Sequence, residues 1–116
     1  MPATLYNIVV ENDADYYRAF SFKDAGGVAI DITGAKLVMK VRRHASDATV
    51  FLTTSTDNGD IVLYDPVNGA FTIFIAQGRL AELTVGNYDQ SLIITLNGVK
   101  TAIWEGLFTV NPGPSR

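Results

Sequence analysis

Hydrophobic residues recur at every second position in one short segment after another, and clusters of Gly, Asp and Asn separate these segments. Because neighbouring side chains of a β-strand point to opposite faces of its sheet, this alternation predicts strands with one buried and one solvated face. Many short strands with turn residues between them are typical of a sandwich or barrel. The segments expected to form strands are residues 3–10, 15–23, 27–31, 35–43, 49–55, 60–65, 69–76, 87–96 and 99–110.

Two of these segments indicate how the sheets are covered. Residues 35–43 alternate between apolar and basic positions, so one face should pack and the other should meet water. Residues 69–76 differ, because Phe74 adds a large apolar side chain to the face opposite that of Phe71 and Ile73. Such a pattern is expected of a strand that is covered on both sides.

Turn and corner residues specify the fold further. Asn-Gly pairs in residues 57–60 and 97–98 join apolar runs, and Asn-Gly suits tight hairpins with positive φ, so we expect a hairpin at each. The only helical candidate is residues 78–83, which can form one or two turns. Tyr88 begins an alternating segment after a loop, as in the tyrosine corner of immunoglobulin-like sandwiches. The sequence therefore predicts an all-β, immunoglobulin-like antiparallel β-sandwich with at most one short helix.

The last predicted strand carries the expected centre of the core. Ala102, Trp104, Phe108 and Val110 alternate onto one face, and Trp104 is the largest of them. Gly106 lies between them and indicates a bulge or a close contact with another backbone.

The chain is predicted to hold one domain, residues 1–110, followed by a flexible C-terminal arm, residues 111–116. Its prolines lack the N–H that a strand needs, so the tail should gain order only on a neighbouring subunit. The residues expected to bind a partner in this way are Asn111, Pro112, Pro114 and Arg116.

Composition narrows the classes of function. The chain has 116 residues with a formal net charge of −3, which gives no broad positive field for nucleic acid or anionic lipid, so neither is expected as a partner. Charged residues make up only 18 % of the chain, against about 25 % in typical domains, which favours a protein that lives in an assembly. There is no cysteine, and we expect neither an export signal nor a membrane-spanning segment.

No constellation of residues indicates catalysis. His44, the single histidine, follows two arginines at a strand end and is expected to be an exposed loop residue. The glycine-rich pieces match neither a nucleophile elbow nor a phosphate loop. We therefore expect no enzyme, no catalytic residue and no cofactor.

Two clusters of acidic residues are candidates for a calcium-binding site. Asp57, Asn58 and Asp60 are closely spaced oxygen donors, but Asp and Asn are also the preferred turn residues, and a distal bidentate glutamate is missing. Residues 11–15 form a second acidic group, which is expected to be a solvated connection. Neither group is assigned a metal, although calcium at the first one stays open.

Two surfaces could bind a ligand. A basic face in residues 36–43 lacks the interleaved aromatics of single-strand binders and is expected to be a solvated sheet face. Tyr6, Tyr16, Tyr17 and Tyr64 could stack on sugars, although half-buried strand positions explain most of them.

The ordered series of segments resembles small structural proteins of tailed bacteriophages, in particular the N-terminal β-sandwich domains of upper baseplate and tail-fibre-anchoring proteins. The resemblance rests on a strand with paired aromatics, a D-x-T-G turn, a strand that ends in arginine and a final E-G-x-x-x-V strand. These elements are residues 17–22, 31–34, 37–42 and 105–110.

The resemblance implies a virion protein that assembles in several copies in the tail, baseplate or neck and anchors fibres or neighbouring proteins. Its partners would be other virion proteins, including portal-vertex components, and further copies of itself. It would be located in the virion after assembly in the bacterial cytoplasm. The alternatives are a carbohydrate-binding module and a capsid decoration protein. A partner's strand or arm could add to an exposed sheet edge through main-chain hydrogen bonds.

Overall fold

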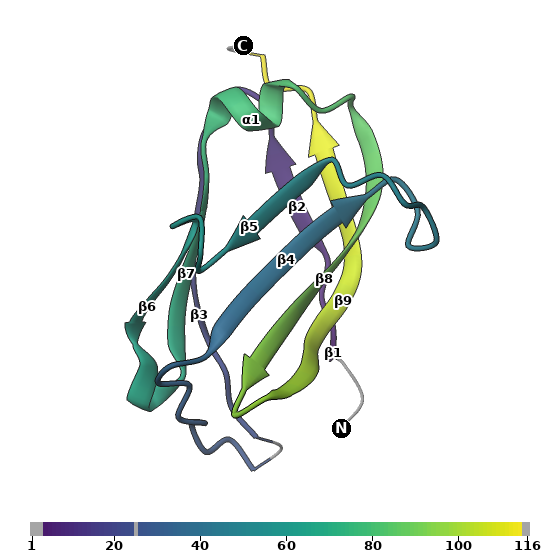
Figure 1. The fold of residues 1–116 in the computed structure, drawn as a ribbon. Helices are drawn as coiled ribbons and strands as arrows, with labels where there is room; N and C mark the ends of the chain where they lie inside the picture. Colours follow the sequence, from purple (N-terminus) through teal and green to yellow (C-terminus); the bar gives the residue numbers. More distant parts are fainter. Residues whose placement is uncertain (1–3, 25, 115–116) are drawn as a thin grey trace.

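The computed structural model describes residues 4–24 and 26–114. These residues fold into two β-sheets that pack face to face (Figure 1). The predicted all-β sandwich is thereby confirmed. The strands are β1 (Thr4–Leu5), β2 (Ile8–Glu11), β3 (Tyr16–Ser21), β4 (Lys36–Arg42), β5 (Leu52–Ser55), β6 (Ile61–Asp65), β7 (Ala70–Ile75), β8 (Gly86–Leu96) and β9 (Val99–Asn111). A short helix α1 (Gln77–Ala81) and a 3-10 turn η1 (Pro66–Asn68) join them.

The larger sheet has the strand order β1-β9-β8-β4-β5, with β2 also on β9, and the smaller sheet has the order β3-β7-β6. All pairs are antiparallel except those of β1 and β2 with β9, which are parallel. Tyr88 begins the corner that the sequence predicts, because its hydroxyl donates a hydrogen bond to the carbonyl oxygen of Thr84 at 2.7 Å. Two packed sheets of mainly antiparallel strands and this corner are those of an immunoglobulin-like sandwich.

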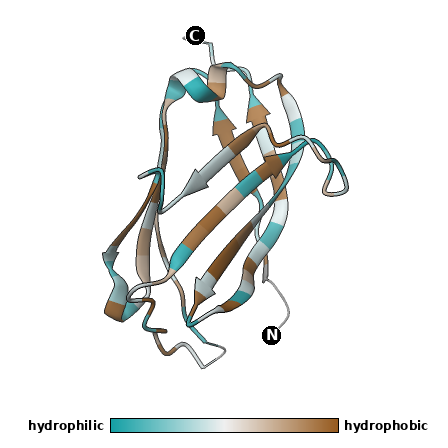
Figure 2. Cartoon of the chain, viewed as in Figure 1, coloured by the Kyte–Doolittle hydropathy of each residue, from teal (hydrophilic) through white to brown (hydrophobic). Residues whose placement is uncertain are grey.

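The core lies between the sheets and is centred on Trp104, as the sequence predicts. Its side chain is only 6 % exposed. The rings of Tyr6, Phe20 and Phe71 surround it, with centroid distances of 4.9, 4.9 and 6.2 Å. Leu80 of α1 closes one end of this core. Figure 2 shows apolar and polar positions alternating along β4, as the sequence predicts.

The prediction of a hairpin at residues 57–60 is wrong, whereas the one at Asn97-Gly98 is confirmed. β5 and β6 flank residues 57–60 but belong to different sheets, so this segment crosses the sandwich. Asn97 and Gly98 have φ values of 54° and 79° and join β8 directly to its antiparallel neighbour β9. Positive φ at both positions is what a two-residue hairpin with matching twist requires.

Two other expectations need correction. Residues 27–31 form no strand and contribute only an isolated bridge between Lys23 and Ala29. In β9 a register shift leaves Ile103 as an extra residue, because Leu92 pairs with Trp104 while Ile93 pairs with Ala102. This bulge turns Ala102 to the outer face of the sheet, away from the core face on which alternation placed it.

The first predicted strand is divided into β1 and β2 at Tyr6 and Asn7. A Cβ atom on Gly106 would overlap the carbonyl oxygen of Tyr6, so glycine allows the first segment to approach β9. Asn7 bridges the break by accepting a hydrogen bond from the N–H of Leu107 at 3.0 Å. Gly106 is therefore the close-contact point that the sequence indicates.

The described part of the tail corrects the predicted start of the C-terminal arm. Asn111 still belongs to β9, and its carbonyl oxygen accepts a hydrogen bond from the N–H of Asn12. Gly113 is buried and donates its N–H to Oδ1 of Asn12 at 2.8 Å. Pro112 and Pro114 are exposed, while residues 115–116, including Arg116, lie outside the described residues.

Candidate functional site

The outer face of the smaller sheet carries no charged side chain over its central rows. We call this surface the apolar face; it comprises Tyr17, Ala19, Val62, Thr72 and Phe74. Of the residues that alternate with them, Ile61, Phe71 and Ile73 are buried in the core, which fixes the orientation of the face, whereas Arg18 on the edge strand β3 is exposed.

The largest side chains of the apolar face are open to solvent. Tyr17 is 66 % exposed, Val62 50 % and Phe74 39 %. Tyr17 and Phe74 pair across β3 and β7, and their rings meet edge to face with centroids 6.5 Å apart. Tyr64, 55 % exposed, follows on β6 beside the bulge of that strand. The apolar face therefore presents a pair of exposed aromatic rings on two paired strands.

Phe74 departs from the sequence prediction in an informative way. The pattern of residues 69–76 predicts a strand covered on both sides, yet no other segment among the described residues covers Phe74. Ile73 and Ile75, its neighbours, are fully buried against the larger sheet. The strand thus has an apolar outer face that this part of the chain leaves open.

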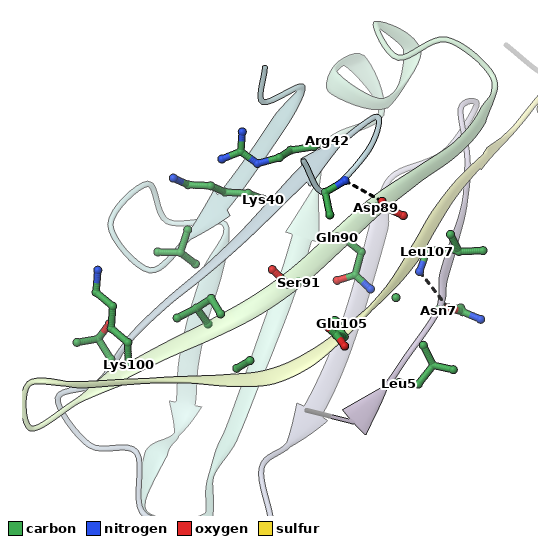
Figure 3. A pocket seen from close by; sticks show the side chains of 16 residues that line it. Leu5, Asn7, Lys40, Arg42, Asp89, Gln90, Ser91, Lys100, Glu105 and Leu107 are labelled. Atoms are coloured by element: carbon green, nitrogen blue, oxygen red, sulfur yellow. Dashed lines mark hydrogen bonds between the residues drawn. The ribbon is translucent and has the colours of Figure 1, made fainter. Parts of the chain in front are cut away.

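The outer face of the larger sheet carries an open hollow of about 900 Å³ (Figure 3). Small or apolar residues of β4, β8 and β9 form its floor, including Val38, Ser91, Ile93, Ala102 and Gly106. Longer charged side chains stand around this floor. They are Lys40, Arg42, Asp89, Lys100 and Glu105.

Two charged residues of the hollow are already used to hold the loop after β4. One guanidinium nitrogen of Arg42 donates to the carbonyl oxygens of Asp47 and Ala48, each at 2.8 Å. Oδ2 of Asp89 accepts the N–H of Ala45 at 2.8 Å. No such bond occupies the side chains of Lys40 and Glu105 among the described residues.

The acidic residues singled out by the sequence serve turns and connections. Oδ1 of Asn58 accepts hydrogen bonds from the N–H groups of Ser55 and Asp60, at 3.1 and 3.0 Å. Asp60 forms an ion pair with Arg79 of α1. Asp15 accepts the N–H of Gln77 at 2.7 Å. In residues 4–24 and 26–114, no three His, Asp or Glu side chains gather where a metal ion could sit.

The four tyrosines considered for sugar stacking do not form one surface. Tyr6 and Tyr16 are half-buried and pack against the core. Tyr17 and Tyr64 are exposed, but they lie on the two outer strands of the smaller sheet, with β7 between them. His44 is exposed in the loop after β4, as the sequence predicts.

Two ionisable groups are perturbed by their surroundings. Burial raises the pKa of Tyr16 above its ordinary value of 10.0, and the neighbouring Tyr6 adds to this, while Arg18 opposes it. Hydrogen bonds from the hydroxyl and the N–H of Thr33 lower the pKa of Asp31. These hydrogen bonds between Asp31 and Thr33 stabilise the D-x-T-G turn, which belongs neither to the apolar face nor to the hollow.

Sequence reasoning missed the two surfaces as units. Phe74 was the available signal for the apolar face, because it places an aromatic ring where a half-exposed strand would carry a polar residue. For the hollow, no local pattern shows that Lys40 and Glu105 lie at the same level of one sheet.

No protein-family model matches the chain, and no curated protein matches its sequence. None of the helices in the described part of the chain is long and apolar enough to cross a membrane.

Proposed function

We propose that this domain is a non-enzymatic structural module that joins proteins within an assembled particle, and that its apolar face docks onto an apolar surface of another subunit. The observation that carries the proposal is the exposure of Phe74 on a strand whose sequence is patterned for cover on both faces. A partner protein would supply that cover.

The composition of the apolar face supports a protein partner. The centres of protein interfaces are depleted in charge and enriched in aromatic residues, and Tyr17 and Phe74 meet both conditions. The side chains are carried by hydrogen-bonded strands, so little conformational entropy is lost when they are buried. Two exposed aromatics and an exposed valine on one sheet face are suited to be the centre of an interface.

The sequence resemblance supports a tailed-bacteriophage virion as the particle. On this proposal the protein assembles in several copies in the tail, baseplate or neck, is located in the virion, and anchors fibres or neighbouring virion proteins. The exposed Pro112 and Pro114, with Asn111 and Arg116, would add a second contact at the chain end. A capsid decoration protein would use the same apolar face at a different place in the particle.

The experiment is to replace both aromatics of the apolar face in the full chain, as Tyr17→Ser together with Phe74→Thr. Both side chains point away from the core, so the variant should keep the melting temperature of the wild type within a few degrees. We expect it to lose at least about tenfold in affinity for the co-expressed product of a neighbouring structural gene, since buried aromatic anchors dominate interface energetics.

Val99→Thr is the matched control, because Val99 is 62 % exposed but lies at the hairpin of the larger sheet. It should bind like the wild type. Equal binding by the wild type and the double variant would remove the apolar face from the proposal.

A carbohydrate-binding module is the second candidate, and the exposed ring pair of Tyr17 and Phe74 is the observation that favours it. Aromatic faces are usual in sugar sites. A glycan array distinguishes the two. If the wild type bound a glycan on the array and Tyr17→Ala abolished this binding, a carbohydrate-binding module would be favoured. An array without signal would favour a protein partner.

A further inference from the structure

A cationic, a small polar and an anionic side chain form one row across the outer face of the larger sheet. Lys40 of β4 pairs in register with Ser91 of β8, and Ser91 pairs with Glu105 of β9. Residues paired across neighbouring strands point to the same face. Figure 3 shows the cation on one flank of the hollow, the small serine in the middle and the carboxylate on the other flank.

The two charges do not pair with each other within the chain. Strand β8 separates them, and two inter-strand spacings amount to roughly 10 Å. Among residues 4–24 and 26–114, the ion pairs are Lys36 with Asp57 and Arg79 with Asp60, so neither Lys40 nor Glu105 is paired. Both are exposed. The row therefore presents an unpaired cation and an unpaired anion at equal distances from a central small residue.

We propose that this face binds a second copy of the chain about a twofold axis that lies between the two sheets, close to the direction of β8. Such an axis places the β4 flank of one copy over the β9 flank of the other. Lys40 of each copy then lies opposite Glu105 of the other, which gives two equivalent ion pairs. An isologous interface requires this self-complementarity.

The neighbouring row is compatible with the same axis. Val38, Ile93 and Ala102 follow one another in register across β4, β8 and β9. The axis would place the two copies of Ile93 against each other and Val38 against Ala102. Packed sheets lie about 10 Å apart, a gap that one lysine and one glutamate side chain span together.

A third row of the same face would bring like charges together, so the two sheets should be farther apart there. Lys36, Thr95 and Lys100 follow in register at the hairpin end of the sheet, so cations would face cations there. Sheets that pack face to face cross at about 30°, which separates their ends. The contact is therefore centred on Ser91 and Ile93.

The size of the face sets the expected affinity. Five strands at about 4.8 Å and seven residues at about 3.3 Å cover roughly 550 Å² per copy. This is below the roughly 800 Å² per partner of standard interfaces. We therefore expect a weak dimer that forms at micromolar or higher concentrations and that salt weakens, because its ion pairs join side chains that are exposed to solvent in each copy.

Charge reversal in the full chain tests the proposal by analytical ultracentrifugation at low salt. Lys40→Glu and Glu105→Lys should each weaken dimerisation at least about tenfold, because like charges then face each other twice. A one-to-one mixture of the two variants should associate again, since both cross-pairs become lysine opposite glutamate. The double variant K40E/E105K should likewise dimerise as the wild type does.

Lys23→Glu and Glu82→Lys make matched controls, because both residues are exposed and neither lines the hollow. They should leave the dimer unchanged, and all variants should keep the wild-type circular dichroism spectrum. A wild type that stays monomeric up to about millimolar concentration would overturn the proposal. A dimer that persists in both Lys40→Glu and Glu105→Lys would also overturn it. If that dimer were lost in the variant with Tyr17→Ser and Phe74→Thr, the apolar face would be the dimer interface instead.

Discussion

Nε1 of Trp104 donates a hydrogen bond to Oε1 of Gln90 at 2.8 Å in the centre of the sandwich. The other end of the same amide, Nε2 of Gln90, donates to the carbonyl oxygen of Tyr6 at 2.7 Å. One buried side chain therefore satisfies the indole of β9 and the backbone at the break between β1 and β2. A buried polar group without such partners would destabilise the fold.

Trp104→Ala should destabilise the domain by about 3–5 kcal/mol, the range for deleting a large buried aromatic side chain. His44→Ala should change the free energy of unfolding by less than about 0.5 kcal/mol, because His44 is exposed in a loop. Chemical denaturation of both variants measures the difference. A larger loss with His44→Ala would contradict the burial of these two residues.

Gln90→Leu should cost about 1–3 kcal/mol, because it keeps the volume but leaves the Trp104 N–H and the Tyr6 carbonyl oxygen without their partner. A double-mutant cycle with Trp104→Phe isolates the bond between the two side chains. We expect a coupling energy of at least about 0.5 kcal/mol, as for residues in direct contact. Strict additivity would mean that the bond contributes nothing.

Tyr88→Phe should cost about 0.5–1.5 kcal/mol through loss of the hydrogen bond to Thr84, with the fold retained. Tyr17→Phe removes a hydroxyl from an exposed ring and is the control. Thermal or chemical denaturation of the two variants compares them. If they proved equally stable, the corner bond would not stabilise this domain.

Local pattern was sufficient for most of the fold, because strand faces depend on alternation alone. Leu37, Met39 and Val41 are fully buried as predicted, and Leu80 of α1 and Leu83, which lies just after the end of this helix, are buried too. Residues 57–60 show the limit of such reasoning. The turn chemistry of Asn58 is the same whether the chain folds back onto β5 or crosses to the other sheet, and long-range packing makes that choice.

The candidate surfaces were less accessible to sequence reasoning. Alternation shows that both faces of β7 are apolar, but it does not say whether the cover of Phe74 belongs to the same chain. The row of Lys40 and Glu105 depends on the pairing of three strands. The bulge at Ile103 also changes which residues of β9 share a face, and it lies three residues before Gly106, where the sequence indicates a bulge or a close contact.

Replacing either of two glycines by alanine should change the stability of the domain, in opposite directions. Gly106→Ala should destabilise the domain by about 1–3 kcal/mol, because its Cβ would overlap the carbonyl oxygen of Tyr6 and push β1 and β2 away from β9. Gly78→Ala should stabilise it by about 0.5–1 kcal/mol, since Gly78 lies in α1 and a Cβ there meets open space. Chemical denaturation measures both, and a shared sign would contradict one of these environments.

Tyr16 should make the domain lose stability at alkaline pH. Burial raises the pKa of Tyr16 in the folded state above 10.0, so the unfolded chain releases this proton first. Stability from this group is therefore complete below pH 10.0 and is lost as the pH rises through the folded-state pKa. Of the neighbouring groups, Tyr6 strengthens the shift and Arg18 weakens it. Denaturant unfolding between about pH 9 and about pH 11 should show a steeper loss for the wild type than for Tyr16→Phe. Tyr17→Phe, which changes an exposed hydroxyl, should keep the wild-type slope; if Tyr16→Phe kept that slope as well, the Tyr16 hydroxyl would not be the group that couples folding to alkaline pH.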